Sequence, residues 1–181
     1  MVKTLILEFS PLQNKILRLL CIQAGNRLNL SDIAQRVKAT PAGVAKALGN
    51  LKRADLISVD KSSSMNLTLV TLARNTATTR QKRIENLQQI HDTTVIDFLE
   101  ENFPGCTIIL FGSYSRGDDT VRSDVDIAII GAKQRVVNLS AYEKQLQRTI
   151  NLQFYGNLSS VHKELRENLC NGIVLSGGIQ L

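Results

Sequence analysis

The sequence predicts an α+β protein with two domains: a small basic domain of three helices and a β-hairpin, then an α/β domain with a small mixed sheet. Two observations support this prediction. The first 70 residues hold ten basic and four acidic residues and the remainder twelve of each, so the net charge of +6 lies in the first segment. After residue 104, strand patterns alternate with helical ones, which is typical of a layered α/β domain. We therefore expect domains over residues 1–72 and 81–181, with a linker at 73–80.

The composition is that of a folded protein. Of 181 residues, 43% are hydrophobic and 21% charged, which argues against disorder. No apolar run approaches the length of a membrane span, and Glu8 interrupts the N-terminal segment where a secretory signal would be apolar. Three widely spaced cysteines fit a reducing compartment. We expect a cytoplasmic protein with no membrane contact.

Helix-start signals organise the first domain. Ser10-Pro11 and Thr40-Pro41 each place a capping residue before a proline at the first helical position. Asn29 lies three residues before Asp32, a capping arrangement that predicts a second short helix between these two helices. Two alternating runs at 57–59 and 67–69 flank a polar tip and predict a β-hairpin.

These elements resemble the winged helix-turn-helix family, chiefly over residues 30–37, 40–48 and 51–57. The resemblance implies that the third helix contacts DNA. The candidate DNA contacts are Thr40, Lys46, Asn50 and Lys61. Lysines suit phosphate contacts, which bind without specifying a base sequence. Winged helices also serve as dimerisation or protein-binding modules, so a homodimer stays open as an alternative.

The second domain is expected to begin with one long helix over about 81–102. The further expected elements are strands at 107–111 and 125–130, a helix near 140–148, a strand at 150–155, a helix at 159–169 and a strand at 173–175. We expect Gly177-Gly178 to be a flexible tail, and Asp118 and Asp119 to lie in a solvated turn.

A phosphate site is predicted where the strand at 107–111 ends. Gly112 permits an unusual backbone and the close approach of a ligand. Ser113 is expected to cap a short helix whose free N–H groups would attract an anion. Arg116 lies in the same turn, and a guanidinium is a strong partner for phosphate.

A carboxylate pair opens the next strand. Asp124 and Asp126 are two residues apart, so on a strand their side chains share a face. Two neighbouring carboxylates repel each other unless a cation lies between them, and Mg²⁺ takes carboxylate and phosphate oxygens together. A phosphate cradle beside a carboxylate pair predicts metal-assisted phosphoryl or nucleotidyl transfer.

Gly112-Ser113, ten further residues and Asp124-Val-Asp126 resemble the signature of the nucleotidyltransferase superfamily that includes DNA polymerase beta-like enzymes. With Arg116 and Ser123, the stretch resembles the minimal nucleotidyltransferases, and the fused winged helix resembles archaeal proteins. The resemblance implies the following assignments: Asp124 and Asp126 as catalytic metal ligands, and Gly112, Ser113, Arg116 and Ser123 as nucleotide-binding residues.

The resemblance further implies Mg²⁺, a nucleoside triphosphate (ATP above all) and transfer of a nucleoside monophosphate to a protein or RNA acceptor. Minimal nucleotidyltransferases are often paired with HEPN-type toxins, and some act as antitoxins by adenylylating the toxin. This sequence departs from the superfamily at one position. Where a later strand commonly carries a third carboxylate, this chain has Asn151, whose amide cannot act as an anionic base.

The sequence therefore leaves two functions open. One is an enzyme that transfers a nucleoside monophosphate, with an antitoxin-type regulatory role. The alternative is a DNA-binding transcriptional regulator whose catalytically weakened second domain serves nucleotide sensing or dimerisation.

Overall fold

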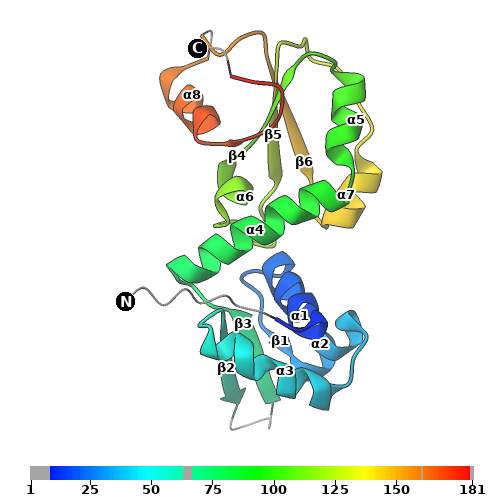
Figure 1. Ribbon diagram of the computed structural model, residues 1–181, viewed down its shortest axis with the longest axis vertical. Helices are drawn as coiled ribbons and strands as arrows, with labels where there is room; N and C mark the ends of the chain where they lie inside the picture. Colours follow the sequence, from blue (N-terminus) through cyan, green and yellow to red (C-terminus); the bar gives the residue numbers. More distant parts are fainter. Residues whose placement is uncertain (1–8, 63–66, 160, 180–181) are drawn as a thin grey trace. The chain divides into compact units, whose positions relative to one another are not determined.

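The computed structural model describes residues 9–62, 67–159 and 161–179 (Figure 1). The chain divides into two compact units, which we call the N-terminal unit (residues 1–78) and the C-terminal unit (residues 79–181). From the sequence, we expect the corresponding domains at 1–72 and 81–181. Each unit has its own hydrophobic core, so each is described by itself.

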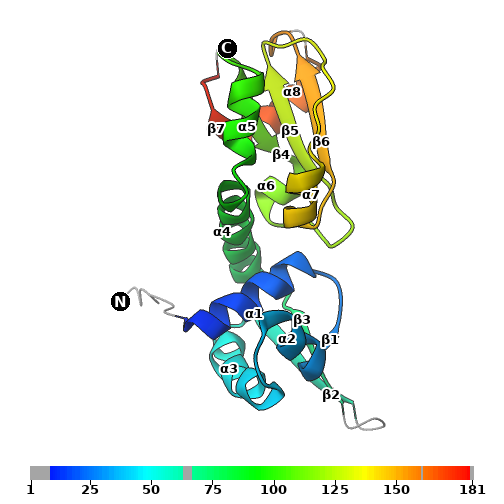
Figure 2. The same cartoon turned by 90° about the vertical axis from the view of Figure 1, so that its right-hand side faces the viewer.

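The N-terminal unit consists of three helices and a three-stranded antiparallel sheet of order β1-β3-β2 (Figure 2). Its elements are α1 (Pro11–Ile22), β1 (Leu28–Asn29), α2 (Leu30–Val37), α3 (Pro41–Arg53), β2 (Ile57–Ser62) and β3 (Leu67–Leu72). Two helices followed by a β-hairpin wing, on a third supporting helix, make the winged helix-turn-helix arrangement. Of the predicted polar tip between β2 and β3, residues 63–66 lie outside the described residues.

All three predicted helix starts are confirmed. Ser10 and Gln13 form a reciprocal capping box at α1. The Asn29 side chain accepts from the N–H of Asp32 at 2.8 Å, and the Thr40 hydroxyl accepts from the N–H of Gly43 at 3.1 Å. Each cap satisfies a backbone donor that a helix end otherwise leaves open. The buried apolar residues that follow the caps build one core.

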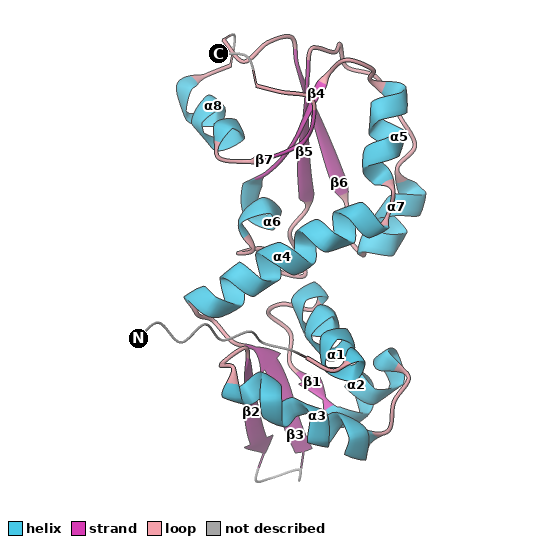
Figure 3. Ribbon diagram, viewed as in Figure 1, coloured by secondary structure: helices cyan, strands magenta, loops and turns pink. Residues whose placement is uncertain are grey.

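The C-terminal unit is built on a small mixed sheet, as predicted, whose four strands have the order β6-β5-β4-β7 (Figure 3). Its elements are most of α4 (Thr76–Asp92), then α5 (Val95–Asn102), β4 (Thr107–Phe111), α6 (Gly112–Arg116), β5 (Val125–Ile130), α7 (Ser140–Leu146), β6 (Ile150–Tyr155), α8 (Lys163–Cys170) and β7 (Ile173–Ser176). The β5–β6 pair is parallel, and β4 is antiparallel to both of its neighbours.

Helices cover both faces of this sheet. Residues of α4, α5 and α7 pack with Ile127 and Ile129 on one face, while Leu169 of α8 packs with Ile109 and Ala128 on the other. Alternate residues of β5 thus belong to different cores, as the pleat of a strand requires. Asp126 lies on the α8 side, at the end of the strand where the helix cover stops.

The expected linker and long helix are both corrected. Residues 73–80 are not a loop throughout, because α4 begins at Thr76. The side chain of Asn75, just before the helix, accepts a hydrogen bond from the N–H of Thr78 at 2.8 Å. The helix expected over 81–102 is two helices, broken at Thr93-Thr94. The Thr93 hydroxyl donates to the carbonyl of Ile90 at 2.8 Å, and Thr94 adopts φ 57°, so the backbone leaves the helical path there.

Two further expectations near the C-terminus were wrong. The helix predicted at 159–169 begins only at Lys163. Gly177-Gly178 is not a loose tail, because the Thr107 hydroxyl donates to the carbonyl of Gly178 at 2.8 Å. A Cβ on Gly177 would lie 2.9 Å from the carbonyl oxygen of Cys106, so this glycine packs directly against the start of β4.

In the part of the chain that the structure describes there is neither a membrane-spanning helix nor a disulfide bond. No described helix has the length and hydropathy needed to cross a membrane. Cys21 is buried, Cys106 is half-buried and Cys170 is exposed, and all three are thiols.

Gly117 provides a test of the packing between α6 and α4. It has φ +79°, and a Cβ there would meet the carbonyl oxygen of Thr79 and lie 2.8 Å from the backbone nitrogen of Arg83. Gly105 has a similar φ of +76°, but no atom lies within 4 Å of its Cβ position. We predict that Gly117→Ala lowers the free energy of unfolding by more than about 2 kcal/mol, and Gly105→Ala by about 1 kcal/mol. Urea denaturation measures both, and equal losses would contradict the close packing.

Candidate nucleotide-binding site

The turn after β4 lies directly against the start of β5. Phe111 pairs with Asp126 in the antiparallel register, which brings Gly112 beside the same carboxylate. Gly112 has φ +74°, and a Cβ on it would lie 2.6 Å from Oδ2 of Asp126. Glycine is therefore required at this position for two reasons: the backbone has a positive φ, and the Asp126 carboxylate occupies the space of a Cβ.

Ser113 lies inside α6 and does not cap it, so the predicted capping role was wrong. The N-cap residue is Phe111, and its side chain makes no capping hydrogen bond. The register explains the difference: the strand passes directly into the helix at Gly112. Ser113 is half-buried, and its backbone N–H belongs to the first turn, where helix donors have no intrahelical partner.

Asp124 and Asp126 lie on either side of the buried Val125. Asp124 is exposed and immediately precedes β5, and Asp126 is half-buried within it. Because side chains alternate along a strand, the Asp126 carboxylate points to the side opposite Val125. That Asp124, just outside the strand, shares this side stays a prediction from the Asp-x-Asp spacing.

Asn151 of β6 lies next to Asp126 in the parallel register. Its amide Nδ2 donates to Oδ1 of Asp126 at 3.0 Å. The resemblance implies a third carboxylate at this position. Here an amide donor lies there instead, beside Asp126. Farther along this face, burial raises the pKa of the Tyr155 phenol, whose hydroxyl donates to Gln153 at 2.6 Å. Tyr155 therefore stays protonated and supplies no base.

Arg116 is half-exposed at the end of α6. Its Nε lies 3.3 Å from Oδ2 of Asp118, and its Nη1 donates to Oδ1 of Asn168 at 3.5 Å. An exposed pair of this kind contributes little stability, so the guanidinium is available to a stronger anion. Asn168 of α8 was missed in the sequence, because no local motif marks an asparagine in a helix.

Ser123 shapes the loop that leads to Asp124. Its hydroxyl accepts from the N–H of Thr120 at 3.0 Å, and its own N–H donates to the carbonyl of Thr120 at 3.0 Å. These bonds define a tight turn immediately before the carboxylate pair. A nucleotide-binding role for Ser123 stays a prediction.

Asp119 is not solvated, and the expectation that it lies in a solvated turn was wrong. Its side chain is fully buried, forms an ion pair with Lys82 and accepts from Nδ2 of Asn86 at 2.7 Å. Lys82 and Asn86 come from α4, more than thirty residues earlier, so local sequence could not reveal them. Asp118, its neighbour, is exposed as expected.

The donor set at Asp124 and Asp126 fits Mg²⁺ bound together with a substrate. No group of three or more histidine, cysteine or acidic side chains that could hold a metal is found among the residues the structure describes. Mg²⁺ commonly binds through one or two carboxylates and completes its shell with water and substrate phosphates.

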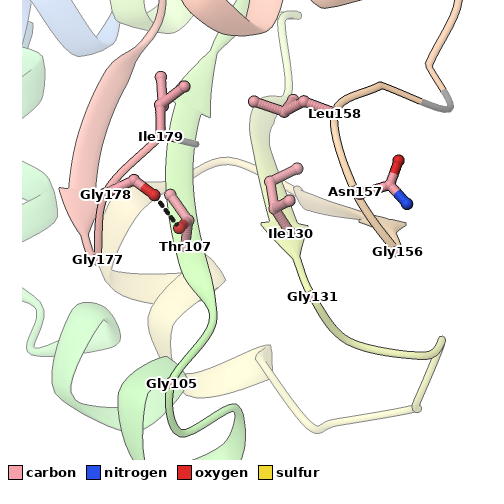
Figure 4. Close-up of a pocket in the computed structure, with 10 residues that line it drawn as sticks. All are labelled: Gly105, Thr107, Ile130, Gly131, Gly156, Asn157, Leu158, Gly177, Gly178 and Ile179. Carbon is pink, nitrogen blue, oxygen red and sulfur yellow. Dashed lines mark hydrogen bonds between the residues drawn. The ribbon is translucent and has the colours of Figure 1, made fainter. Parts of the chain in front are cut away.

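A separate cavity of about 280 Å³ lies at the opposite end of the sheet (Figure 4). Its lining includes Thr107, at the start of β4, and Ile130, at the end of β5, whereas the carboxylates lie at the other ends of these strands. Among the described residues of its lining are five glycines and no charged side chain. These residues offer no carboxylate to hold a divalent cation, so the candidate site is placed at the carboxylate pair and not at this cavity.

The predicted DNA contacts lie on the exposed side of α3 and on the wing. Lys46 and Lys61 are exposed, and Thr40 is the N-cap of α3. Asn50 accepts a hydrogen bond from the guanidinium of Arg53, one turn later on the same helix. Lys46 and Lys61 thus face solvent, where they are accessible to a polyanion.

Comparison with known families identifies the C-terminal unit. Residues 93–170 match the model of the family described as nucleotidyltransferase domain, and the match includes Gly112, Ser113 and both aspartates. This segment is a nucleotidyltransferase domain. The chain is also 43% identical over 47 residues to protein adenylyltransferase MntA of Shewanella oneidensis. That alignment covers 25% of this chain and 34% of MntA, so the chain spans about a third of the length of this relative.

Several solved structures share features of the fold. AdcR of Streptococcus pyogenes matches with 22% identity, a TM-score of 0.42, and coverage of 53% of this chain and 69% of that chain. MepR of S. aureus, solved as a DNA complex, matches with 20% identity, a TM-score of 0.40, and coverage of 53% and 76%. Likenesses at these TM-scores assign no function, and the winged-helix assignment rests on the order of the elements.

Proposed function

We propose that this protein transfers a nucleoside monophosphate from a nucleoside triphosphate, ATP in particular, to a protein or RNA acceptor. One observation carries the proposal: the backbone at Gly112, where the phosphate cradle begins, lies against the Asp126 carboxylate. Groups that bind phosphate and groups that bind a divalent cation are therefore adjacent, as nucleotidyl transfer requires.

In this proposal Asp124 and Asp126 hold Mg²⁺, while the first turn of α6 with Ser113 and Arg116 holds the triphosphate. Bound Mg²⁺ would neutralise charge on the carboxylates and on the phosphates of the substrate. Gly112 keeps the helix start close to the carboxylates, and Asn151 orients Asp126 through its amide. An acceptor oxygen would form a bond to the α-phosphorus as its proton passes to solvent, and the bond from that phosphorus to the pyrophosphate leaving group would break.

The acceptor that we favour is a protein side chain. The name of MntA states that it is a protein adenylyltransferase, and its 47-residue similarity to this chain supports the same class of acceptor. The resemblance to minimal nucleotidyltransferases makes a HEPN-type toxin the partner to test first. Modification of such a partner would make this protein an antitoxin-type regulator.

The first prediction concerns the aspartates. Asp124→Asn and Asp126→Asn should each lower label transfer from α-³²P-ATP with Mg²⁺ by at least about a hundredfold, since either change removes a metal-binding charge. Candidate acceptors are a co-expressed HEPN-type protein and small RNAs. Asp97→Asn, an exposed change on α5, is the matched control and should keep wild-type transfer. Equal transfer by the wild type and both site variants would contradict the proposal.

The second prediction concerns Asn151. Asn151→Asp should lower the Mg²⁺ concentration for half-maximal nucleotide binding by about tenfold, because a third carboxylate adds a charged ligand. Titration of Mg²⁺ against a fluorescent ATP analogue measures this value. Gln153→Glu, two residues along the same face of β6, controls for added charge alone. A half-maximal Mg²⁺ concentration in Asn151→Asp that is equal to or higher than the wild-type value would contradict the placement of residue 151 at the metal site.

DNA binding by the N-terminal unit is a second candidate function. The exposure of Lys46 on α3 and Lys61 on the wing favours it, since winged helices present these two elements to a duplex. In the corresponding alternative, the protein is a transcriptional regulator and its nucleotidyltransferase domain serves nucleotide sensing or dimerisation. The two functions are compatible within one chain, because they use different units.

The third prediction tests this candidate. Lys46→Ala and Lys61→Ala should each weaken duplex binding at low salt by about threefold to tenfold and reduce the salt dependence of the affinity, because each removes one phosphate contact. Lys163→Ala, an exposed lysine of the other unit, is the control. Fluorescence anisotropy with a labelled duplex gives the affinities. Absence of duplex binding by the wild type at low salt would exclude this function.

A further inference from the structure

A buried charged cluster lies behind the candidate site. It consists of Asp119, Lys82 and Arg148, whose side chains are 0%, 2% and 3% exposed. Charged side chains are almost never buried to this degree unless they are paired, because removal from water penalises the charged form. The assignment of catalytic and nucleotide-binding residues uses none of these three.

The contacts of Asp119 reach two other parts of the unit. Nζ of Lys82 donates to the backbone carbonyl of Asp119 at 2.9 Å and pairs with its carboxylate. Nδ2 of Asn86 donates to Oδ1 of Asp119 at 2.7 Å and to the carbonyl of Tyr114, within α6, at 2.9 Å. A guanidinium nitrogen of Arg148 lies 3.7 Å from Oδ2 of Asp119. The cluster thus connects α4, α6 and the turn before β6.

These connected segments carry the candidate site. Asp119 lies in the segment 117–124, which links α6 to Asp124. Arg148 precedes β6 and Asn151, and the adjacent carbonyl of Thr149 accepts from the N–H of Val125 at 2.8 Å. Within 117–124, Thr120 and Ser123 bond to each other and so maintain the shape of the turn. The bonds of Asp119, in contrast, attach the turn to α4.

We propose that Asp119 is a positioning residue, which holds the segment 117–124 on Lys82 and Asn86 of α4 and thereby sets Asp124 relative to the Gly112-Ser113 turn. A carboxylate whose Oδ1 meets donors from fixed positions of α4 has few alternative placements, because a buried charge that loses its donors keeps an uncompensated desolvation cost. An apolar side chain at 119 would fill the space without specifying the position of the loop. The consequence for Mg²⁺ and nucleotide binding rests on the proposed function, whereas the consequence for the loop does not.

The test compares Asp119→Asn, which keeps the shape and removes the charge, with Ile129→Ala, which destabilises the same sheet from a fully buried position on β5. Hydrogen exchange of amides 118–124 measures the loop, thermal unfolding measures stability, and a Mg²⁺ titration with the fluorescent ATP analogue measures the site. In Asp119→Asn we expect exchange at 118–124 to be at least about tenfold faster and the half-maximal Mg²⁺ concentration at least about fivefold higher. Ile129→Ala should change neither at temperatures where both variants are folded.

Two results would overturn the proposal. One is that amides 118–124 exchange at equal rates in the two variants. The other is that the wild type binds the nucleotide in a Mg²⁺-dependent way and Asp119→Asn has the same half-maximal Mg²⁺ concentration. If Asp119→Asn does not fold, the triple variant Lys82→Met/Asp119→Leu/Arg148→Met removes the three charges of the cluster together. Retained protection of the loop in the triple variant would also overturn the proposal. A wild-type protein that binds no nucleotide would instead refute the proposed function, and the exchange measurement would still decide the role of Asp119.

Discussion

The close approach of the Asp126 carboxylate to the backbone of Gly112 is the constraint on which the candidate site depends. A side chain at position 112 would occupy the place of that carboxylate, so the turn must be a glycine with positive φ. The β4–β5 register places the two residues together, and the β5–β6 register adds Asn151 on the other side. Sheet pairing thus brings Gly112, which directly follows β4, together with Asp126 of β5 and Asn151 of β6. The chemistry of the site follows from which residues lie at this end of the sheet.

The loop between Gly112 and Asp124 is held from behind by α4. Gly117 lets the loop backbone approach the helix backbone, and Asp119 provides the polar attachment next to it. Both contacts act on the segment 117–124, which ends at Asp124. Arg116 is also contacted by a helix, because its guanidinium donates a hydrogen bond to Asn168 of α8 on the other face of the sheet. Helices on both sides therefore define the loop that the metal and phosphate would use.

The distribution of charge separates two kinds of binding. The excess positive charge belongs to the N-terminal unit, where lysines face solvent, and it suits a polyanion without describing any chemistry. In the C-terminal unit eleven basic and twelve acidic residues nearly cancel, and a few of them are buried or adjacent. Reactivity depends on these local arrangements, and this nearly neutral unit carries the nucleotidyltransferase signature.

Local patterns in the sequence determined most of the secondary structure and the candidate site residues. The strands at 107–111, 125–130 and 150–155 agree with the prediction, and the helix caps at Ser10, Asn29 and Thr40 do also, because each depends on neighbours a few residues away. Tertiary structure alone decided the rest. The burial of Asp119 requires Lys82, 37 residues away, and the contact of Arg116 requires Asn168, 52 residues away. Such partners leave no periodic or spacing signal, since only the folded sheet and its covering helices bring them together.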